Sequence, residues 1–361
     1  MLREGWTSAW LGGPRVRDVL RASHVRSDRD SQISRLRFGA AGRPTEDQLH
    51  RTLPGLPPRG RVRKQCVHLR RVGNIARLST RLNMNFAGRV VVITGASDGI
   101  GAELARQLAR EKARLVLAAR GAAELVRVVQ QCRERGAEAI EVVTDVAVED
   151  DCRRLIERAV AAYGGIDALV ANAGVSMHAR FTDIEDFSTF ERLFRINTMG
   201  TIWCVRHAYP HLAAARGLIV GVSSIAGRTG VPERTTYCTT KFAQSGFLDA
   251  LRIEAADDGI AVMAVYPGVV ATETRRRGWN GRGEPAGVSG LSEADAMPVD
   301  ECVRLIIEGM RARRREVVMT ARSRLGLWLK LLAPGLVDRM ARAALARSPH
   351  AGAQDPARRT S

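Results

Sequence analysis

Tyr237 and Lys241 are the residues whose types and spacing most directly indicate chemistry in this chain. The sequence contains only four tyrosines and four lysines, against 52 arginines, and one of each lies four positions apart in Tyr-Cys-Thr-Thr-Lys. Side chains four apart on a helix share one face, so the ammonium would lie beside the phenol. A free phenol has a pKa of about 10, and a neighbouring cation lowers it by stabilising the phenolate. The pair therefore predicts a general acid or base, with a partly exposed helical pair as the alternative.

A glycine-rich segment precedes this pair in the chain. It runs from Thr94 to Gly101 as Thr-Gly-Ala-Ser-Asp-Gly-Ile-Gly. Gly95, Gly99 and Gly101 would permit a tight turn and close approach of the backbone to a pyrophosphate at a helix N-terminus. A structural turn is the alternative, but a position between a predicted strand and a predicted helix favours dinucleotide binding. The spacing is Gly-x-x-x-Gly-x-Gly, not Gly-x-Gly-x-x-Gly.

A sheet must bring the glycine segment and the Tyr–Lys helix together. From Arg89 onward, short apolar runs alternate with helical stretches. Continuous apolar strands between helices are typical of a parallel sheet covered on both faces. We therefore predict an α/β fold, a Rossmann-like doubly wound parallel sheet of about seven strands with helices on both faces. Strands are expected at 90–93, 115–118, 139–143, 168–170, 218–222, 261–265 and 317–319, and helices at 101–111, 122–135, 149–162, 185–213, 237–255 and 299–312.

Six ordered marks resemble those of the short-chain dehydrogenase/reductase family, in its standard-length group. After the glycine segment the marks are Asn172-Ala-Gly174, Asn197, Ser224, Tyr237-x-x-x-Lys241 and Pro267-Gly268. The resemblance covers about residues 86–320 and implies the fold predicted above. Ala171 departs from the pattern, since the family more often has a second Asn there. We expect little effect, because the retained Asn172 is the residue that usually supports the sheet and the loop.

The resemblance implies four catalytic residues. Tyr237 would be the general acid that protonates a carbonyl oxygen during reduction, or the base in the reverse direction. Lys241 would lower the pKa of Tyr237 and hydrogen-bond the nicotinamide ribose. Ser224, thirteen residues before Tyr237, would donate to the substrate oxygen, with Ser223 as its rival by type. Asn197 would anchor a water that continues a proton relay to solvent. A surface or capping role is the alternative for each.

The resemblance also implies a nicotinamide dinucleotide. An acidic residue after the second strand suits the ribose 2′-OH of NAD, whereas a basic one suits the 2′-phosphate of NADP. Ala119 has no carboxylate, and the planar guanidinium of Arg120 matches the geometry of a phosphate, so NADP is favoured over NAD. In the glycine segment, Asp98 occupies a position where a second basic residue is often found. The predicted cofactor-binding residues are Gly95, Ser97, Asp98, Gly99, Ile100, Gly101, Arg120, Asp145, Asn172, Ala173, Gly174, Tyr237, Lys241, Pro267, Gly268 and Thr272, and no metal ligand is predicted.

Residues 1–83 are much more basic than the rest of the chain. They hold 18 Lys and Arg against 6 Asp and Glu, which is +12 of the total +18. Rich in Arg, Gly, Pro and Ser, the segment is expected to be a disordered basic extension. A nucleic-acid or membrane-binding tail and an organelle transit peptide are alternatives, and nucleic acid is not the favoured partner. Our hypothesis is that translation natively begins at Met84.

The remaining chain is expected to form a catalytic domain over 84–320 and an amphipathic helical segment and tail over 321–361. The glycine-rich stretch 275–298 corresponds to the family's substrate lid. Trp328 lies among leucines and basic residues in the last segment, which would cover the domain, pair with a second copy or contact a membrane interface.

Composition narrows the function classes. The six cysteines are scattered and form no Cys-x-x-Cys motif, so we expect reduced thiols. No window of 18 apolar residues and no secretory signal occurs. We therefore expect a cytoplasmic protein, with peripheral membrane contact as the alternative. The leading hypothesis is an NADP(H)-dependent oxidoreductase interconverting a secondary alcohol and a ketone or aldehyde, on a small and lipophilic substrate. A nucleotide-sugar epimerase or dehydratase and a non-catalytic dinucleotide-binding protein are alternatives, and the resemblance implies a homodimer or homotetramer.

Overall fold

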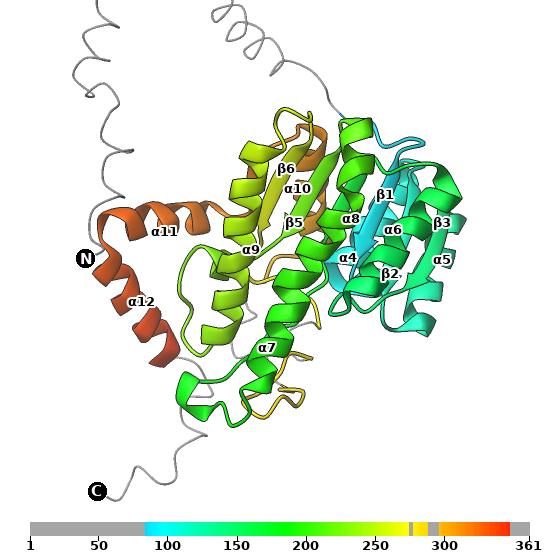
Figure 1. The fold of residues 1–361 in the computed structure, drawn as a ribbon. Coiled ribbons are helices and arrows are strands. Elements are labelled where there is room, and N and C mark those ends of the chain that lie inside the picture. Colours follow the sequence, from blue (N-terminus) through cyan, green and yellow to red (C-terminus); the bar gives the residue numbers. More distant parts are fainter. Residues whose placement is uncertain (1–83, 274–276, 288–295, 347–361) are drawn as a thin grey trace, which may run out of the picture. The chain divides into compact units, whose positions relative to one another are not determined.

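The computed structural model of the protein describes residues 84–273, 277–287 and 296–346. Seven strands form one sheet in the order β3-β2-β1-β4-β5-β6-β7, and every neighbouring pair is parallel (Figure 1). The order reverses between β1 and β4, which is the switch point where such sheets bind ligands. The strands are β1 Val90–Thr94, β2 Arg114–Ala119, β3 Glu138–Val143, β4 Ala168–Ala171, β5 Leu218–Val222, β6 Ala261–Tyr266 and β7 Glu316–Val318.

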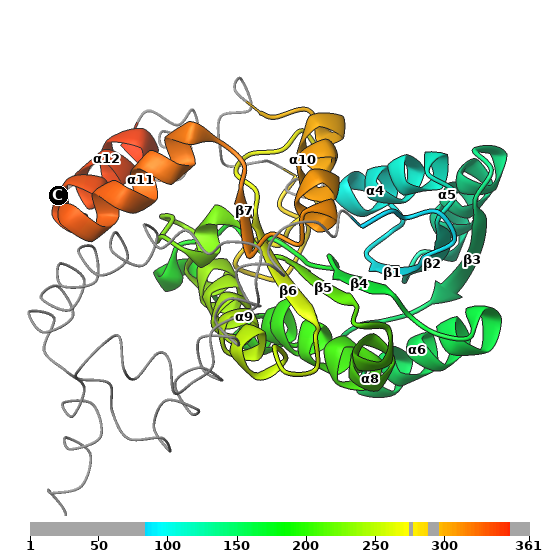
Figure 2. The same cartoon turned by 90° about the horizontal axis from the view of Figure 1, so that it is seen from above.

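Helices cover both faces of the sheet (Figure 2). One face carries α4 (Gly99–Arg110), α5 (Ala122–Glu134) and α10 (Val299–Arg311). The other face carries α6 (Glu149–Tyr163), α8 (Gly200–Ala215) and α9 (Thr235–Glu254). The predicted doubly wound Rossmann-like sheet is therefore confirmed.

Alternate residues of β1 enter the two cores, which explains its unbroken apolar sequence. Val91 and Ile93 pack under α4 and α10, whereas Val90 and Val92 pack under α6 and α8. Since both faces are buried, polar alternation is absent, as expected for a central parallel strand.

The helix predicted over 185–213 is interrupted. The chain forms α7 (Ser188–Phe194), a π-helical turn η2 (Arg195–Met199) and then α8. A π-turn inserts one extra residue and rotates the side chains that follow, and it is often found at functional sites. Asn197 lies at its centre and is fully buried.

Two further helices follow β7. They are α11 (Ala321–Leu332), which the Thr320 hydroxyl caps by accepting from the Ser323 N–H at 3.0 Å, and α12 (Pro334–Ala346). The expectations for residues 1–83 and for the tail beyond 346 lie outside the described residues. Across the described part of the chain, no helix is long and apolar enough to cross a membrane, and no cluster of His, Cys, Asp and Glu could hold a metal ion.

Candidate active site

A cavity of about 1810 Å³ opens where the carboxyl ends of the central strands meet. Its wall includes Gly95 after β1, Asn172 after β4, Ser224 after β5 and Pro267 after β6. Typical pockets for one small ligand measure roughly 300–1,000 Å³. The space therefore accommodates a dinucleotide together with a second molecule.

The glycine segment forms a tight turn that tolerates no side chain at two positions. Gly95 has a φ of +64°, and a Cβ there would lie 2.8 Å from the Cα of Ala173. A Cβ on Gly101 would lie 2.2 Å from the Gly95 carbonyl oxygen. The turn leads directly into α4, whose first-turn N–H groups are suited to bind a phosphate. The residues present thus fit a pyrophosphate group.

Asn172 fastens the end of β4 to this turn. Its amide nitrogen Nδ2 donates to the carbonyls of Thr94 at 3.0 Å and Gly95 at 3.1 Å. The Thr94 hydroxyl in turn accepts from the backbone N–H groups of Asn172 and Ala173, both at 3.0 Å. The two strands on either side of the switch point are therefore held at a defined separation.

Arg120 and Asp145 lie on the wall beyond the turn, after β2 and β3. Arg120 is exposed at the end of β2, and Ala119 before it lines the same wall. The Asp145 carboxylate accepts from the Ala147 N–H at 3.0 Å, so one of its oxygens is used within its own loop. A further carboxylate, that of Glu124 in the first turn of α5, also lines the wall.

Ser223 and Ser224 differ in environment, although their sequence does not separate them by type. Ser223 is buried, and its hydroxyl donates to the Lys241 backbone carbonyl at 3.2 Å. The Ser224 hydroxyl accepts from the Ala226 N–H at 3.2 Å, so its own hydrogen is directed to another acceptor. Ser224 is therefore the better donor to a bound oxygen atom.

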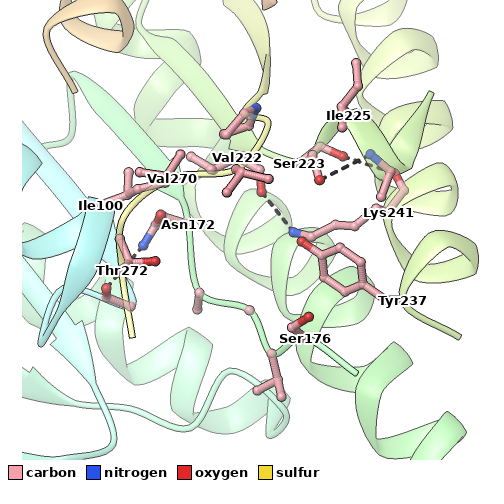
Figure 3. A pocket seen from close by; sticks show the side chains of 18 of the residues that line it. Ile100, Asn172, Ser176, Val222, Ser223, Ile225, Tyr237, Lys241, Val270 and Thr272 are labelled. Atoms are coloured by element: carbon pink, nitrogen blue, oxygen red, sulfur yellow. Dashed lines mark hydrogen bonds between the residues drawn. The ribbon is translucent and has the colours of Figure 1, made fainter. Parts of the chain in front are cut away.

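Tyr237 and Lys241 lie one turn apart on α9 and face the cavity together (Figure 3). The Lys241 Nζ is 5.9 Å from the centroid of the Tyr237 ring. It donates to the carbonyl of Val222 at 2.9 Å and to Oε1 of Gln244 at 3.1 Å. Burial lowers the pKa of Lys241 to about 7, because the charged form loses its hydration.

Asn197 acts from behind the cavity wall. Its Oδ1 accepts from the Val175 N–H at 2.8 Å, and its Nδ2 donates to the Val175 carbonyl at 2.9 Å and to the Thr240 hydroxyl at 3.0 Å. A Cβ on Gly174 would lie 3.1 Å from Asn197 Oδ1 and 3.5 Å from Lys241 Nζ. The π-turn thus ties the loop after β4 to α9, close to the ammonium.

The structure brings most of the predicted site residues to one cavity. Among the described residues, Gly99, Gly101 and Asn197 are placed behind its wall rather than on it. The predicted residues on the wall are Gly95, Ser97, Asp98, Ile100, Arg120, Asp145, Asn172, Ala173, Gly174, Ser224, Tyr237, Lys241, Pro267, Gly268 and Thr272.

Other polar residues at the site were not predicted. Arg277 lines the cavity and forms an ion pair with Asp98, and the buried Arg234 donates to the Ser176 hydroxyl at 2.7 Å. Gln244 is fully buried outside the described cavity lining and accepts from the ammonium at 3.1 Å. Its position three residues after Lys241 is a signal that helical spacing could have supplied, whereas nothing local indicates that Arg234 is buried.

Comparison with known proteins agrees with this geometry. Residues 89–282 match the family described as short chain dehydrogenase. The chain is 32% identical over 278 residues to 11-beta-hydroxysteroid dehydrogenase A of Sesamum indicum, covering 75% of this chain and 80% of that protein. It is 34% identical over 268 residues to 11-beta-hydroxysteroid dehydrogenase A of Arachis hypogaea, covering 72% and 76%.

Solved structures of low sequence identity share the fold. A short chain dehydrogenase/reductase from Burkholderia phymatum in complex with NAD has a TM-score of 0.62 at 24% identity, covering 70% of this chain and 96% of that one. An alcohol dehydrogenase from Thermococcus sibiricus complexed with 5-hydroxy-NADP has a TM-score of 0.56 at 24% identity, covering 64% and 95%. The chain belongs to the short-chain dehydrogenase/reductase family, as an oxidoreductase of CH–OH groups in a family that binds nicotinamide dinucleotides.

Proposed function

We propose that the protein is an NADP(H)-dependent oxidoreductase that interconverts a secondary alcohol and a ketone, or a primary alcohol and an aldehyde, at a Ser224–Tyr237–Lys241 site. The observation that carries this proposal is the convergence of the three side chains on one cavity wall, across from the glycine turn. When bound, the dinucleotide supplies or accepts the hydride.

In this proposal each side chain has one task. Tyr237 gives its phenolic proton to the carbonyl oxygen during reduction and takes it back during oxidation. Lys241 carries positive charge beside the phenol and so favours the phenolate that remains. Ser224 donates its free hydroxyl hydrogen to the same substrate oxygen and holds it in place. Asn197 keeps the π-turn and α9 together, and its water relay remains a prediction.

Replacing the phenol tests the reaction. We expect Tyr237→Phe to lower kcat at least about 100-fold for a ketone substrate while the NADPH affinity changes little, because general acid catalysis contributes about 10²–10⁴. Tyr209→Phe is the matched control, since the Tyr209 hydroxyl is on α8 and donates to Asp258 at 2.6 Å, away from the cavity lining. Equal activity of Tyr237→Phe and Tyr209→Phe would contradict the assignment.

The cofactor preference rests on Arg120. A guanidinium at the end of β2 can bind a 2′-phosphate with two parallel hydrogen bonds, and Ala119 places no carboxylate there. The Glu124 carboxylate argues in the opposite direction, but its Oε2 lies only 2.6 Å from where a Gly121 Cβ would stand, so it is folded against its own helix start. We therefore place the 2′-phosphate against Arg120.

Binding of NADPH and NADH to the full chain, followed by nicotinamide fluorescence, tests this preference. We expect the wild type to bind NADPH more tightly and Arg120→Asp to reverse the order. Arg127→Asp makes the same charge change on α5, at an exposed residue outside the described cavity lining, and should leave the preference intact. Unchanged discrimination in Arg120→Asp would refute the role of Arg120.

The substrate is proposed to be lipophilic. The cavity wall includes apolar residues, with Trp279 and Met297 from the segment after β6 and Val231 from the loop before α9, and Trp279 packs in one cluster with Tyr237. The relatives reported above are named as hydroxysteroid dehydrogenases, which fits a bulky apolar ketone. A steroid ketone should give a lower KM than a short polar ketone such as hydroxyacetone. The reverse order of KM values would reject the proposal of a lipophilic substrate.

Two assembly proposals accompany this function. The exposed apolar face of α11 and α12 is proposed to contact an acidic membrane surface, as argued at the scale of the whole molecule below. A homodimer or homotetramer is proposed from the family resemblance, and sedimentation of the full chain as a monomer would reject it.

A further inference from the structure

Gln244 is a fully buried polar residue that the mechanism above does not use. It lies on α9 one turn beyond Lys241, with an exposed fraction of 0%. A buried primary amide costs several kcal/mol, roughly 2–7, unless its groups are hydrogen-bonded. Both ends are bonded here: Oε1 accepts from Lys241 Nζ at 3.1 Å, and Nε2 donates to the Thr201 hydroxyl at 2.8 Å.

The directions of these hydrogen bonds are determined by the ammonium. An ammonium has donors only, so the oxygen of the amide must face Lys241 and its nitrogen must face Thr201. The Thr201 hydroxyl accepts from that nitrogen and donates onward to the Asn197 carbonyl at 3.4 Å. A chain of oriented dipoles therefore leads from the π-turn to the ammonium, with its negative end at Nζ.

The ammonium has three N–H donors, and two of them are engaged within the protein. Val222 at the end of β5 accepts one, and the fully buried Gln244 accepts another. Because Lys241 also lines the cavity, the third N–H is left for the cavity side. The position of Gln244 thus decides where the remaining donor points.

We propose that Gln244 is a positioning residue for the reaction: its carbonyl oxygen holds the Lys241 ammonium in its charged form with one N–H directed at the cavity. This inference rests on the proposed function, since it gives the catalytic lysine its orientation and charge. It differs from a packing role, which any side chain of similar volume would satisfy.

The groups that contact the ammonium are neutral. They are the Val222 carbonyl from β5 and Oε1 of Gln244 from α9, and the centroid of the Tyr237 ring lies 5.9 Å away. Among the described residues burial is the cause that moves the pKa of Lys241, to about 7, and no carboxylate opposes it. With a pKa of about 7 the ammonium is half protonated at neutral pH, and the dipole of the Gln244 amide, whose oxygen accepts from Nζ, favours the charged form.

Two substitutions separate charge retention from packing. Gln244→Met keeps the length of the side chain but removes the acceptor, so the pKa of Lys241 should fall further. Gln244→Glu keeps the shape and adds a negative charge, so the pKa should rise. Ser245→Ala is the matched control, because this neighbouring buried hydroxyl bonds the backbone carbonyl of Lys241 and the Ser223 hydroxyl but not Nζ.

Lysine NMR on the full chain measures the effect without requiring activity. With only four lysines in the chain, ¹³Cε-lysine labelling gives few signals, and Lys241→Met identifies the one that titrates near neutrality. We expect a shift of about one pKa unit, a tenfold change in proton affinity, in opposite directions for Gln244→Met and Gln244→Glu, and none for Ser245→Ala. An unchanged pKa in both Gln244 variants would overturn the proposal.

Kinetics then connects the titration to the reaction. The high-pH limb of kcat should move to lower pH in Gln244→Met and to higher pH in Gln244→Glu, in step with the NMR values. If the Gln244 variants lower kcat only as much as Ser245→Ala does, and the high-pH limb of kcat does not move, Gln244 has only a packing role. That outcome would contradict the proposal. If the wild type neither binds nicotinamide dinucleotides nor turns over ketones, the proposed function fails, while the NMR shifts still decide whether Gln244 holds the ammonium.

Discussion

Lys241, for which we propose a catalytic role, is buried at a cost in stability. The side chain is 3% exposed and its folded-state pKa is about 7, against 10.5 for an unperturbed lysine. Below pH 7 both the folded and the unfolded chain carry the proton. Between pH 7 and 10.5 the unfolded chain binds one proton more, so the free energy of unfolding rises with pH through this window.

Lys241→Met should remove this pH dependence. The wild type is expected to gain stability relative to Lys241→Met between pH 7 and 9, by at most about 1.4 kcal/mol per pH unit. The acceptors on Val222 and Gln244 lose their donor in the variant at every pH, so that loss shifts the curves without changing the slope. Urea unfolding at several pH values measures the difference, and parallel curves would show that the buried lysine keeps its ordinary pKa.

The site residues that could be predicted from the sequence are those whose roles follow from residue type and spacing within one short segment. A glycine required by a turn and a Tyr–Lys pair on one helical face are recognisable from spacing alone. Arg234 could not be recognised as a site residue, because its burial and its partner Ser176 depend on a segment more than 40 residues away. Helical spacing places Gln244 beside Lys241, but it does not reveal its partner Thr201, which is also more than 40 residues away.

The strands could be predicted to within one or two residues, since β1, β4 and β5 at the centre of the sheet are buried on both faces and so have unbroken apolar sequences. The break in the predicted helix 185–213 could not, because η2 contains neither Gly nor Pro and differs from the α-helix only in its hydrogen-bond pattern. That break is what places Asn197 against Thr240 and the loop after β4. The departure from regular helix is therefore located at the site, where such departures are expected.

One lysine contributes to the attachment of α11. Lys330 Nζ donates to the Arg228 carbonyl at 2.8 Å and lies 5.3 Å from the ring centroid of Phe242 on α9. A hydrogen bond contributes about 0.5–1.5 kcal/mol and an exposed cation–π contact about 0.5–1 kcal/mol. The helix should therefore open locally at modest cost while the sheet stays folded.

Lys330→Ala should speed amide hydrogen exchange in Ala321–Leu332 about tenfold, because the opening free energy falls by about 1–2 kcal/mol. The exchange of β4 and β5 should be unchanged. Arg339→Ala, on the exposed side of α12, is the control for loss of one positive charge. Equal protection of α11 in the wild type and Lys330→Ala would show that other contacts hold this helix, namely the hydrogen bond from Arg324 Nε to the Val318 carbonyl at 3.1 Å and the packing of Leu327.

At the scale of the whole molecule, α11 and α12 present apolar side chains to solvent beside the cavity. Leu325, Trp328 and Leu332 are 69%, 67% and 83% exposed. The two helices carry five basic residues and one acidic residue, and Arg322 and Ser323 line the cavity. An apolar face with basic neighbours favours the interface of an acidic bilayer, from which a lipophilic substrate could enter.

Flotation of the full chain with vesicles tests this proposal. The wild type should float with vesicles rich in phosphatidylserine, and less so with neutral vesicles or at high salt. The triple variant Leu325→Gln, Trp328→Gln and Leu332→Gln should lose most of this binding. Its matched control replaces three exposed apolar residues of the catalytic domain, Val126→Gln, Val143→Gln and Ile253→Gln, and should float like the wild type. If both triple variants float equally, this face does not bind the membrane. A different outcome would be that the wild type does not bind vesicles and only the Leu325, Trp328 and Leu332 variant loses an oligomer in sedimentation. In that case the face joins two copies of the chain instead.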